Sequence, residues 1–198
     1  MIKTALRATL ATIVLLVITA VIYPLVITGV AQVALKDKAN GSLVEVNGKA
    51  VGSSLIGQAW KGDQWFYGRP SAVSYDASTS SGTNLGPNSK DLESAIADQA
   101  AAIIKLEGPY NPGLTVAQIP ADLLTSSSSG LDPDISEAAA LLQVPRIASV
   151  RGLSEADVRA LVEDHLVGRT LGFIGQARVN VLELNIALQA MGQSSSAG

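Results

Sequence analysis

The residues that could do chemistry in this chain are few. His165 is the only histidine among 198 residues, and there is no cysteine. This composition excludes disulfides, thiolate metal sites, a cysteine nucleophile and a metal site built from several histidines. No Gly-x4-Gly-Lys-Ser/Thr phosphate loop, Asp-Lys-Thr-Gly phosphorylation motif or Gly-x-Ser-x-Gly nucleophile elbow occurs. We therefore expect no catalytic residue, no metal ligand and no cofactor bound by this chain itself.

The remaining candidates fit turns and helix caps better than a reaction centre. The serine run 126–129 and His165 could serve a hydrolase, but a lone histidine in the last turn of a helix most often complements the helix dipole. Asp132 and Asp134 flank Pro133, and this spacing is typical of a turn followed by a cap. A membrane-anchored hydrolase and a stand-alone extracytoplasmic binding domain stay open as alternatives.

Arginines recur along the chain after residue 60, among them Arg69, Arg146, Arg151, Arg169 and Arg178. We expect each to pair with a carboxylate or a loop carbonyl rather than to bind a phosphate. The glycine-rich segment 168–175 superficially resembles a dinucleotide loop, but no strand precedes it, so caps and turns are the better interpretation. The net charge of −3 provides no basic field, and we expect no nucleic-acid partner.

The first 35 residues predict a membrane anchor. No charged side chain occurs from Ala8 to Leu35, and about 20 apolar residues suffice to cross the hydrocarbon core of a bilayer. We expect a transmembrane helix over about 10–33, in contact with membrane lipid. A cleaved signal peptide and a buried core helix are disfavoured because the apolar run is too long for either. Pro24 is compatible with a helix in lipid if a local adjustment satisfies the freed carbonyl.

The side of the membrane on which the rest of the chain lies is nearly undetermined by charge. Lys3 and Arg7 precede the apolar run, and Lys36, Lys38 and Lys49 follow it. The short N-terminal segment favours a single-pass topology with the N-terminus inside. We therefore expect residues 36–190 to form an extracytoplasmic domain.

The first half of this domain predicts a hairpin, a short strand, a long loop and a helix. Residues 42–51 alternate around Asn47-Gly48, which is typical of a hairpin with a type I′ turn. The aromatic segment 64–67 predicts a short strand, and the Ser/Gly/Thr/Asn-rich segment 71–88 predicts a loop. Apolar spacing over 91–107 predicts an amphipathic helix, with Asn88 as its N-cap.

The second half predicts helices with identifiable ends. One starts near Ser136 and must bend or restart at Pro145. Another covers 155–166, with Ser154 as N-cap and Gly168 as C-cap, and a third covers 181–190 behind Asn180. We expect a disordered tail over 191–198. The fold class is therefore α+β, with a single N-terminal transmembrane helix followed by a mostly helical soluble domain that carries a small antiparallel sheet.

Several segments in this order resemble a known family. They are Gly68-Arg-Pro-Ser-Ala72, Ser81-Gly-Thr-Asn-Leu-Gly-Pro-Asn88, Ser129-Gly-Leu-Asp-Pro-Asp-Ile-Ser136, Pro145-Arg-Ile-Ala148 and Arg178-Val-Asn-Val-Leu-Glu-Leu-Asn185. Behind one N-terminal anchor, they resemble KdpC, the C subunit of the bacterial Kdp potassium-transporting P-type ATPase, over nearly the whole chain. The chain departs from the family pattern at Asp134, where a histidine is usual, and at Leu166, where a threonine is usual.

The resemblance implies an accessory, non-catalytic subunit in the cell inner membrane, partnered by KdpA, KdpB and KdpF. The complex would use ATP, K⁺ and Mg, with ATP hydrolysed by KdpB. The family is described as a catalytic chaperone that raises the affinity of KdpB for ATP. With an extracytoplasmic placement, we expect the domain to rest over the potassium entrance of KdpA.

The expected interaction surface consists of polar residues in turns and caps, namely Arg69, Asn84, Asn88, Asp132 and Asn180. In the anchor, small or kinked positions allow a neighbouring helix to approach closely. We expect such packing at Pro24, Thr28 and Gly29.

Overall fold

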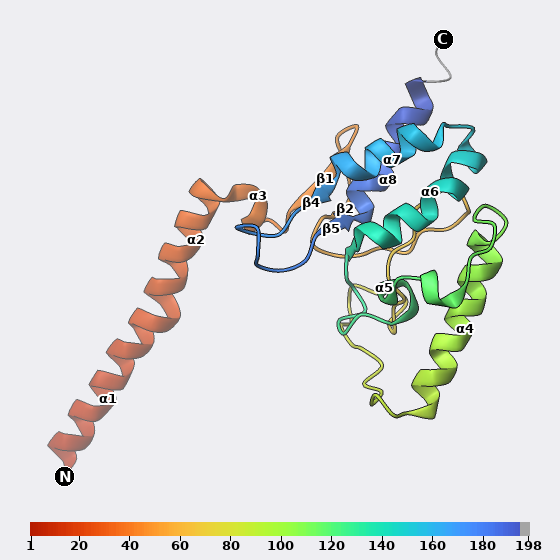
Figure 1. Ribbon diagram of the computed structural model, residues 1–198. Coiled ribbons are helices and arrows are strands. Elements are labelled where there is room, and N and C mark those ends of the chain that lie inside the picture. Colours follow the sequence, from red (N-terminus) through yellow and green to blue (C-terminus); the bar gives the residue numbers. More distant parts are fainter. Residues whose placement is uncertain (195–198) are drawn as a thin grey trace. The chain divides into compact units, whose positions relative to one another are not determined.

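A computed structural model describes residues 1–194 of the chain (Figure 1). The chain divides into two compact units, the first covering Met1–Ser53 and the second beginning at Ser54. The first contains the predicted anchor and hairpin, and the second contains the remaining helices and a small sheet.

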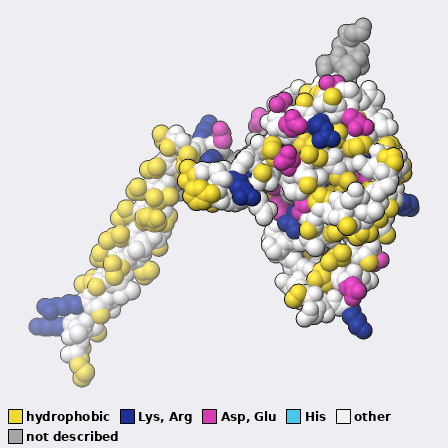
Figure 2. Space-filling model, viewed as in Figure 1, with side chains coloured by type: hydrophobic (Ala, Val, Ile, Leu, Met, Phe, Trp, Pro, Cys, Tyr) yellow, Lys and Arg dark blue, Asp and Glu magenta, His cyan; other side chains and the backbone are white. Residues whose placement is uncertain are grey.

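The anchor is one continuous helix over Ile2–Ala34, built from α1 (Ile2–Leu16), the π-helical segment η1 (Val17–Ile22) and α2 (Tyr23–Ala34). Within the described residues it is the only helix long and apolar enough to cross a membrane. Hydrophobic side chains run along it, and basic ones lie near its N-terminal end (Figure 2). This observation fits the predicted membrane anchor.

The π-helical segment explains how the helix continues through Pro24. Proline has no N–H to donate, and its ring crowds the carbonyl four residues earlier, which here belongs to Ala20. In η1 the backbone hydrogen bonds span five residues instead of four. The N–H of Tyr23, for example, donates to the carbonyl of Ile18. The widened turn is the local adjustment that the sequence required.

The first unit ends in a short helix and a hairpin. After α3 (Lys36–Ala39), strands β1 (Leu43–Val46) and β2 (Lys49–Ser53) pair antiparallel. Asn47 and Gly48 both have positive φ, 53° and 74°. Two successive positive φ values are the signature of a type I′ turn, so the predicted hairpin is confirmed.

The second unit is mostly helical. Its elements are α4 (Lys90–Glu107), the 3-10 turn η2 (Val116–Gln118), α5 (Ala121–Leu124), β3 (Asp134–Ile135), α6 (Glu137–Arg151), α7 (Glu155–Asp164), β4 (Leu166–Val167), β5 (Arg178–Asn180) and α8 (Val181–Ser194). The three strands form an antiparallel sheet in the order β3-β5-β4. The predicted α+β class with a small antiparallel sheet is confirmed.

The core of the second unit lies between the C-terminal helices. Val144 and Ile147 of α6, Val158 of α7, and Leu184 and Leu188 of α8 are all fully buried. Apolar burial of this kind supplies most of the stabilisation of these helices.

Three predicted helix ends differ from those observed. Ser89, and not Asn88, caps α4 by accepting a hydrogen bond from the N–H of Asp91 at 3.2 Å. Helix α7 ends at Asp164, because the next residues pair with β5 as strand β4, so Gly168 is not its C-cap. The predicted tail begins too early, since α8 continues to Ser194, and residues 195–198 lie outside the described part of the chain.

Helix α6 does not restart at Pro145, so one of the two predicted outcomes, a bend or a restart, is excluded. The helix runs unbroken from Glu137 to Arg151, with Ser136 as its N-cap and Gly152 in the left-handed region after it. The neighbours of Pro145, Val144 and Arg146, are fully buried. Tertiary packing on both sides therefore holds a helix that local propensity alone would interrupt.

The aromatic segment 64–67 is partly buried, with Phe66 fully buried at its centre, but it is not a strand. Its backbone is bonded by side chains from two helices instead of by a neighbouring strand. Asn185 accepts from the N–H of Phe66 at 2.9 Å and donates to its carbonyl at 2.9 Å. Gln143 bonds the N–H and carbonyl of Tyr67 in the same way, at 2.8 and 3.1 Å. The predicted strand is wrong because these amides make the bonds that a strand partner would have made.

Candidate interaction site around Arg69

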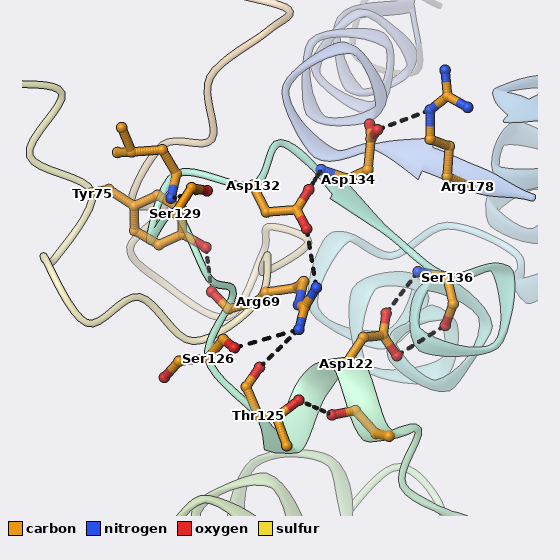
Figure 3. Close-up of polar contacts among 12 residues, drawn as sticks. Arg69, Tyr75, Asp122, Thr125, Ser126, Ser129, Asp132, Asp134, Ser136 and Arg178 are labelled. Atoms are coloured by element: carbon orange, nitrogen blue, oxygen red, sulfur yellow. Dashed lines mark hydrogen bonds and ion pairs between the residues drawn. The ribbon is translucent and has the colours of Figure 1, made fainter. Parts of the chain in front are cut away.

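An open cavity of about 650 Å³ lies where three parts of the second unit meet. Arg69 reaches it from the loop after the buried aromatic segment, and Asp122 reaches it from α5. The strands contribute Asp134 from β3 and Arg178 from β5, as Figure 3 shows. The cavity is therefore rich in charge, and its polar groups come from segments far apart in the sequence.

Arg69 and Asp132 form the central ion pair of this cavity. The Nη1 of Arg69 lies 3.1 Å from the Oδ2 of Asp132, and the two side chains are 26% and 29% exposed. The Nη2 of Arg69 also approaches the carbonyl oxygens of Thr125 and Ser126, at 3.4 and 3.5 Å (Figure 3). The guanidinium thus ties together the two ends of the loop that connects α5 to β3.

Tyr75 holds the backbone of Arg69 from the other side. Its hydroxyl donates a hydrogen bond of 2.5 Å to the carbonyl of Arg69 (Figure 3). Burial, together with the nearby negative charge of Asp132, raises the pKa of Tyr75 to about 12. The hydroxyl therefore keeps its proton at neutral pH and remains a hydrogen-bond donor.

Asp134 forms a second ion pair at the rim of the cavity. Its Oδ2 lies 2.9 Å from the Nε of Arg178, whose side chain is 49% exposed. Burial raises the pKa of Asp134 above its ordinary value, while the Arg178 charge opposes that shift and the Asp132 charge adds to it. The Oδ1 of Asp132 accepts from the N–H of Asp134 at 3.1 Å, which is the turn expected for the Asp-Pro-Asp sequence.

Asp122 fixes the start of α6. It accepts hydrogen bonds from the N–H and the hydroxyl of Ser136, at 2.7 and 3.0 Å (Figure 3). The hydroxyl oxygen of Ser136 in turn accepts from the N–H of Ala139, which caps the helix. This carboxylate is therefore engaged in structure.

Three of the five predicted surface residues lie together. Arg69 and Asp132 are paired, and Asn180 donates to the Oδ1 of Asp134 at 3.4 Å and to the carbonyl of Ser54 at 2.8 Å. The Oδ1 of Asn180 also accepts from the N–H of Glu183, so the predicted cap of the last helix is confirmed.

Asn84 and Asn88 do not line this cavity. Both are exposed in the loop before α4, where Asn84 has a φ of 53°. Asn84 and Asn88 are therefore separate from the cluster around Arg69. Their role in a partner interface stays a prediction.

The predicted packing positions of the anchor lie in α2. Pro24 and Thr28 are four residues apart and so share one face of the helix. A Cβ added to Gly29 would meet no atom within 4 Å. Close approach of another helix at these positions stays a prediction.

The cavity is also lined by four residues that were not predicted to lie on the interaction surface, namely Asp122, Asp134, Ser136 and Arg178. Ser136 and Asn180 both carry the signature of an N-cap, and β3 and β5 pair Asp134 with Asn180 directly. A pairing between strands of two and three residues leaves little signal in the sequence. The helix caps were thus predictable from the sequence, but the fact that they lie together at one cavity was not.

The arginines behave as predicted at four of the five positions. Arg69 and Arg178 pair with carboxylates at the cavity, Arg146 pairs with Glu107 in the core, and Arg151 donates to the carbonyl of Gln64 at 2.8 Å. Within the described residues, the Arg169 side chain shows no hydrogen bond or ion pair, so its predicted pairing is not confirmed.

The groups that a hydrolase would use do not line this cavity. The Nδ1 of His165 lies 2.9 Å from the carbonyl oxygen of Leu161, one turn earlier in its own helix. Ser127 is buried, and its N–H donates to the carbonyl of Pro70. Among residues 1–194 no group of three or more histidine, aspartate or glutamate side chains is arranged to hold a metal ion. The arrangement around Arg69 is thus suited to contact through charge and hydrogen bonds.

Comparison with known proteins identifies the family. The family model described as "KdpC: K+-transporting ATPase, c chain" matches residues 5–190. A Potassium-transporting ATPase KdpC subunit of Koribacter versatilis is 46% identical over 188 residues, covering 94% of both chains. The protein of that name from Caulobacter vibrioides is 52% identical over 171 residues, covering 85% of this chain and 83% of its own. This chain therefore belongs to the KdpC family of potassium-transporting ATPase subunits.

Proposed function

We propose that this chain is a non-catalytic accessory subunit that assembles with KdpA, KdpB and KdpF in the cell inner membrane. It helps to assemble a high-affinity, ATP-driven potassium uptake complex and acts as a catalytic chaperone that raises the affinity of KdpB for ATP. ATP, K⁺ and Mg are used by the complex, and this chain supplies contact surface.

The observation that carries the proposal is the polar cavity around Arg69. Its two ion pairs are only partly covered, with Arg69 26% and Arg178 49% exposed, and its carboxylates are engaged in hydrogen bonds. The exposed side of such an ion pair can replace its bound water with a partner's polar groups, while the hydrogen bonds within the chain stay in place. The groups that the alternative hydrolase would use, His165 and the serines 126–129, do not line this cavity.

The topology that we favour has the second unit outside the membrane, over the potassium entrance of KdpA. ATP is cytoplasmic, so this unit would not touch the nucleotide bound to KdpB. The effect on ATP affinity would then pass through the anchor helix and the subunits beside it. Coupling between distant sites requires only that both favour the same state of the complex.

A co-purification experiment tests the assembly role. We expect the tagged Arg69→Ala/Asp132→Ala double variant, expressed with KdpA, KdpB and KdpF, to retain less of these subunits than the unaltered chain. Glu93→Ala/Lys105→Ala is the matched control, because it removes one acidic and one basic side chain from exposed positions of α4. Equal recovery with both variants would contradict a partner contact at the cavity.

The chaperone role is tested by ATP kinetics of the purified complex. We expect the KM for ATP to rise when this chain is omitted, while the maximal rate changes less. An unchanged KM would reject the effect on ATP affinity and leave the assembly role to the co-purification result.

Cysteine labelling tests the topology, because the chain has no cysteine of its own. Ser128 is exposed, whereas its neighbour Ser127 is buried, so Ser128→Cys is the variant to label. We expect a membrane-impermeant maleimide to reach it in intact spheroplasts. Labelling only after lysis would reject the extracytoplasmic topology.

Enlarging a small residue tests the packing of the anchor. Gly29→Leu should loosen the complex in detergent, because a leucine would block close approach of a neighbouring helix. Ala31→Leu adds a comparable side chain about 200° around the same helix. Unchanged co-purification of Gly29→Leu, or equal loss with both variants, would contradict the predicted packing face.

A further inference from the structure

The most exposed apolar side chains of the second unit lie at the tip of the β4–β5 hairpin. Leu171 is 78% exposed and Phe173 is 72% exposed, and Ile174 lies beside them, also exposed. The chain has only two phenylalanines, and the other, Phe66, is fully buried in the core. A cluster of large apolar side chains on a soluble surface usually marks a site that something else covers.

This tip is an ordered turn. Thr170 and Ile174 exchange two backbone hydrogen bonds of 2.9 Å, and the N–H of Phe173 donates to the carbonyl of Thr170. Leu171 and Gly172 both have positive φ, 54° and 83°. Asparagine or glycine would adopt the first of these conformations more easily than leucine does. A strained apolar residue at the outermost point of a hairpin suggests that the exposed leucine has a function.

The charge of the hairpin is basic. Residues 168–177 include Arg169 and no acidic residue, whereas Arg178 at the base of the hairpin is paired with Asp134. Apolar side chains flanked by arginine are typical of segments that lie in the interface of an anionic bilayer. There the apolar groups enter the acyl boundary, and the guanidinium groups stay among the phosphates.

The base of the hairpin is also where the chain enters the second unit. Asn180, which ends β5, donates a hydrogen bond of 2.8 Å to the carbonyl of Ser54, the first residue of that unit. The segment that leads from the anchor therefore reaches the second unit beside β5. A covalent tether of this kind raises the effective concentration of the tip at the membrane, so even weak contacts would be occupied.

We propose that the tip formed by residues 169–174 inserts into the interfacial layer of an anionic phospholipid leaflet, as a second attachment of the chain beside its anchor helix. This inference rests on the proposed anchoring of the chain by α1, η1 and α2. Leu171, Phe173 and Ile174 enter the acyl boundary, and Arg169 binds lipid phosphate. The attachment limits the orientations that the second unit can adopt over the membrane.

The test uses the full chain with one added cysteine. Phe173→Cys is labelled with the polarity-sensitive dye NBD and reconstituted into vesicles of phosphatidylcholine with phosphatidylglycerol, the same composition in both leaflets. We expect blue-shifted emission and quenching by nitroxide-labelled lipid. Ser94→Cys, on an exposed position of α4, is the matched control and should show neither. Leu171→Cys repeats the measurement at a second position of the tip.

Removing the charge of the tip sharpens the test. We expect Arg169→Gln to lower the ratio of inserted to free tip about fivefold in anionic vesicles, and far less in pure phosphatidylcholine. Lys105→Gln, an exposed basic residue of α4, should leave the ratio unchanged. Equal loss with both variants would overturn the role of Arg169.

The outcomes separate this inference from the proposed function. If the chain resists alkaline carbonate extraction while the dye at position 173 behaves as it does in water, only the lipid contact is overturned. The dye could also report an apolar environment only when KdpA, KdpB and KdpF are present, with no quenching by the nitroxide-labelled lipid. The tip would then bind a protein partner, and the lipid contact would again be overturned. If carbonate releases the chain, the anchoring itself fails.

Discussion

The second unit contains two groups of arginine–carboxylate pairs that are alike in distance and different in surroundings. In the core, the Nε of Arg146 lies 2.9 Å from Glu107, and the two side chains are 0% and 3% exposed. At the cavity, the Nε of Arg178 lies 2.9 Å from Asp134, with the side chains 49% and 26% exposed. Distance alone would rank the two pairs as equal.

Their hydrogen-bond partners show what each pair does. Arg146 also donates to the backbone carbonyls of Asp63 and Trp65 and to the side chain of Gln143, so it holds the buried aromatic segment in place. For Arg178, the described residues show only the bond to Asp134. A buried charge that loses its partner is costly, whereas an exposed one returns to water. The core pair is therefore structural, whereas the cavity pairs are partly exposed to water, as the proposed partner contact requires.

The largest expected effect comes from Arg146→Met. It leaves the Glu107 carboxylate and two carbonyls without their donor in the core, so we expect the free energy of unfolding to fall by about 3–5 kcal/mol. Arg178→Met is the matched control and should cost less than about 1 kcal/mol. Urea unfolding of the full chain in detergent, followed by tryptophan fluorescence, measures both. Equal losses would break the distinction between the two regions.

A smaller loss is expected from Asn185→Ala. Its amide bonds both backbone groups of Phe66, and leaving buried polar groups unpaired costs about 1–3 kcal/mol. The same unfolding experiment measures this loss. Asn88→Ala removes an exposed amide and should change stability by less than about 0.5 kcal/mol. A neutral Asn185→Ala would mean that water replaces the amide and that the aromatic segment does not depend on it.

The pair of Arg69 and Asp132 should contribute still less. A double-mutant cycle of Arg69→Ala and Asp132→Ala is expected to give a coupling free energy of about 0.2–1 kcal/mol, as for other partly exposed pairs. The coupling should weaken as salt is added. A coupling free energy above about 3 kcal/mol would show that this pair is structural, like Arg146 and Glu107. It would then count against the proposed contact surface at the cavity.

The smallest effect is a pH dependence at Asp134. Its pKa is raised in the folded protein, chiefly by burial, so the folded state holds the proton more tightly than the unfolded chain does. The free energy of unfolding should therefore fall as the pH rises from the ordinary aspartate pKa through the raised value. Asp134→Asn removes this dependence. Titration of unfolding from acid to neutral pH tests it, and parallel curves for both proteins would contradict the prediction.

Local signals predicted the elements whose causes are local. The uncharged run before Lys36, the Asn47-Gly48 turn and the caps at Ser154 and Asn180 each depend on a few neighbouring residues. Membership of the family was also visible, because the motifs that carry the resemblance are contiguous. The anchor helix even continues through Pro24 by a local change to π-helical bonding.

What the sequence determined by itself is the set of pieces, namely an apolar helix long enough to span a bilayer, an α+β domain behind it and turns rich in hydrogen-bonding residues. Only the tertiary structure decided that Gln143 and Asn185 replace a strand partner for the aromatic segment, and that Arg69 meets Asp132 across 63 residues. Whether a charge is paired in the core or exposed at a cavity depends on which distant segments surround it. No local pattern encodes that, because burial is a property of the whole packed unit.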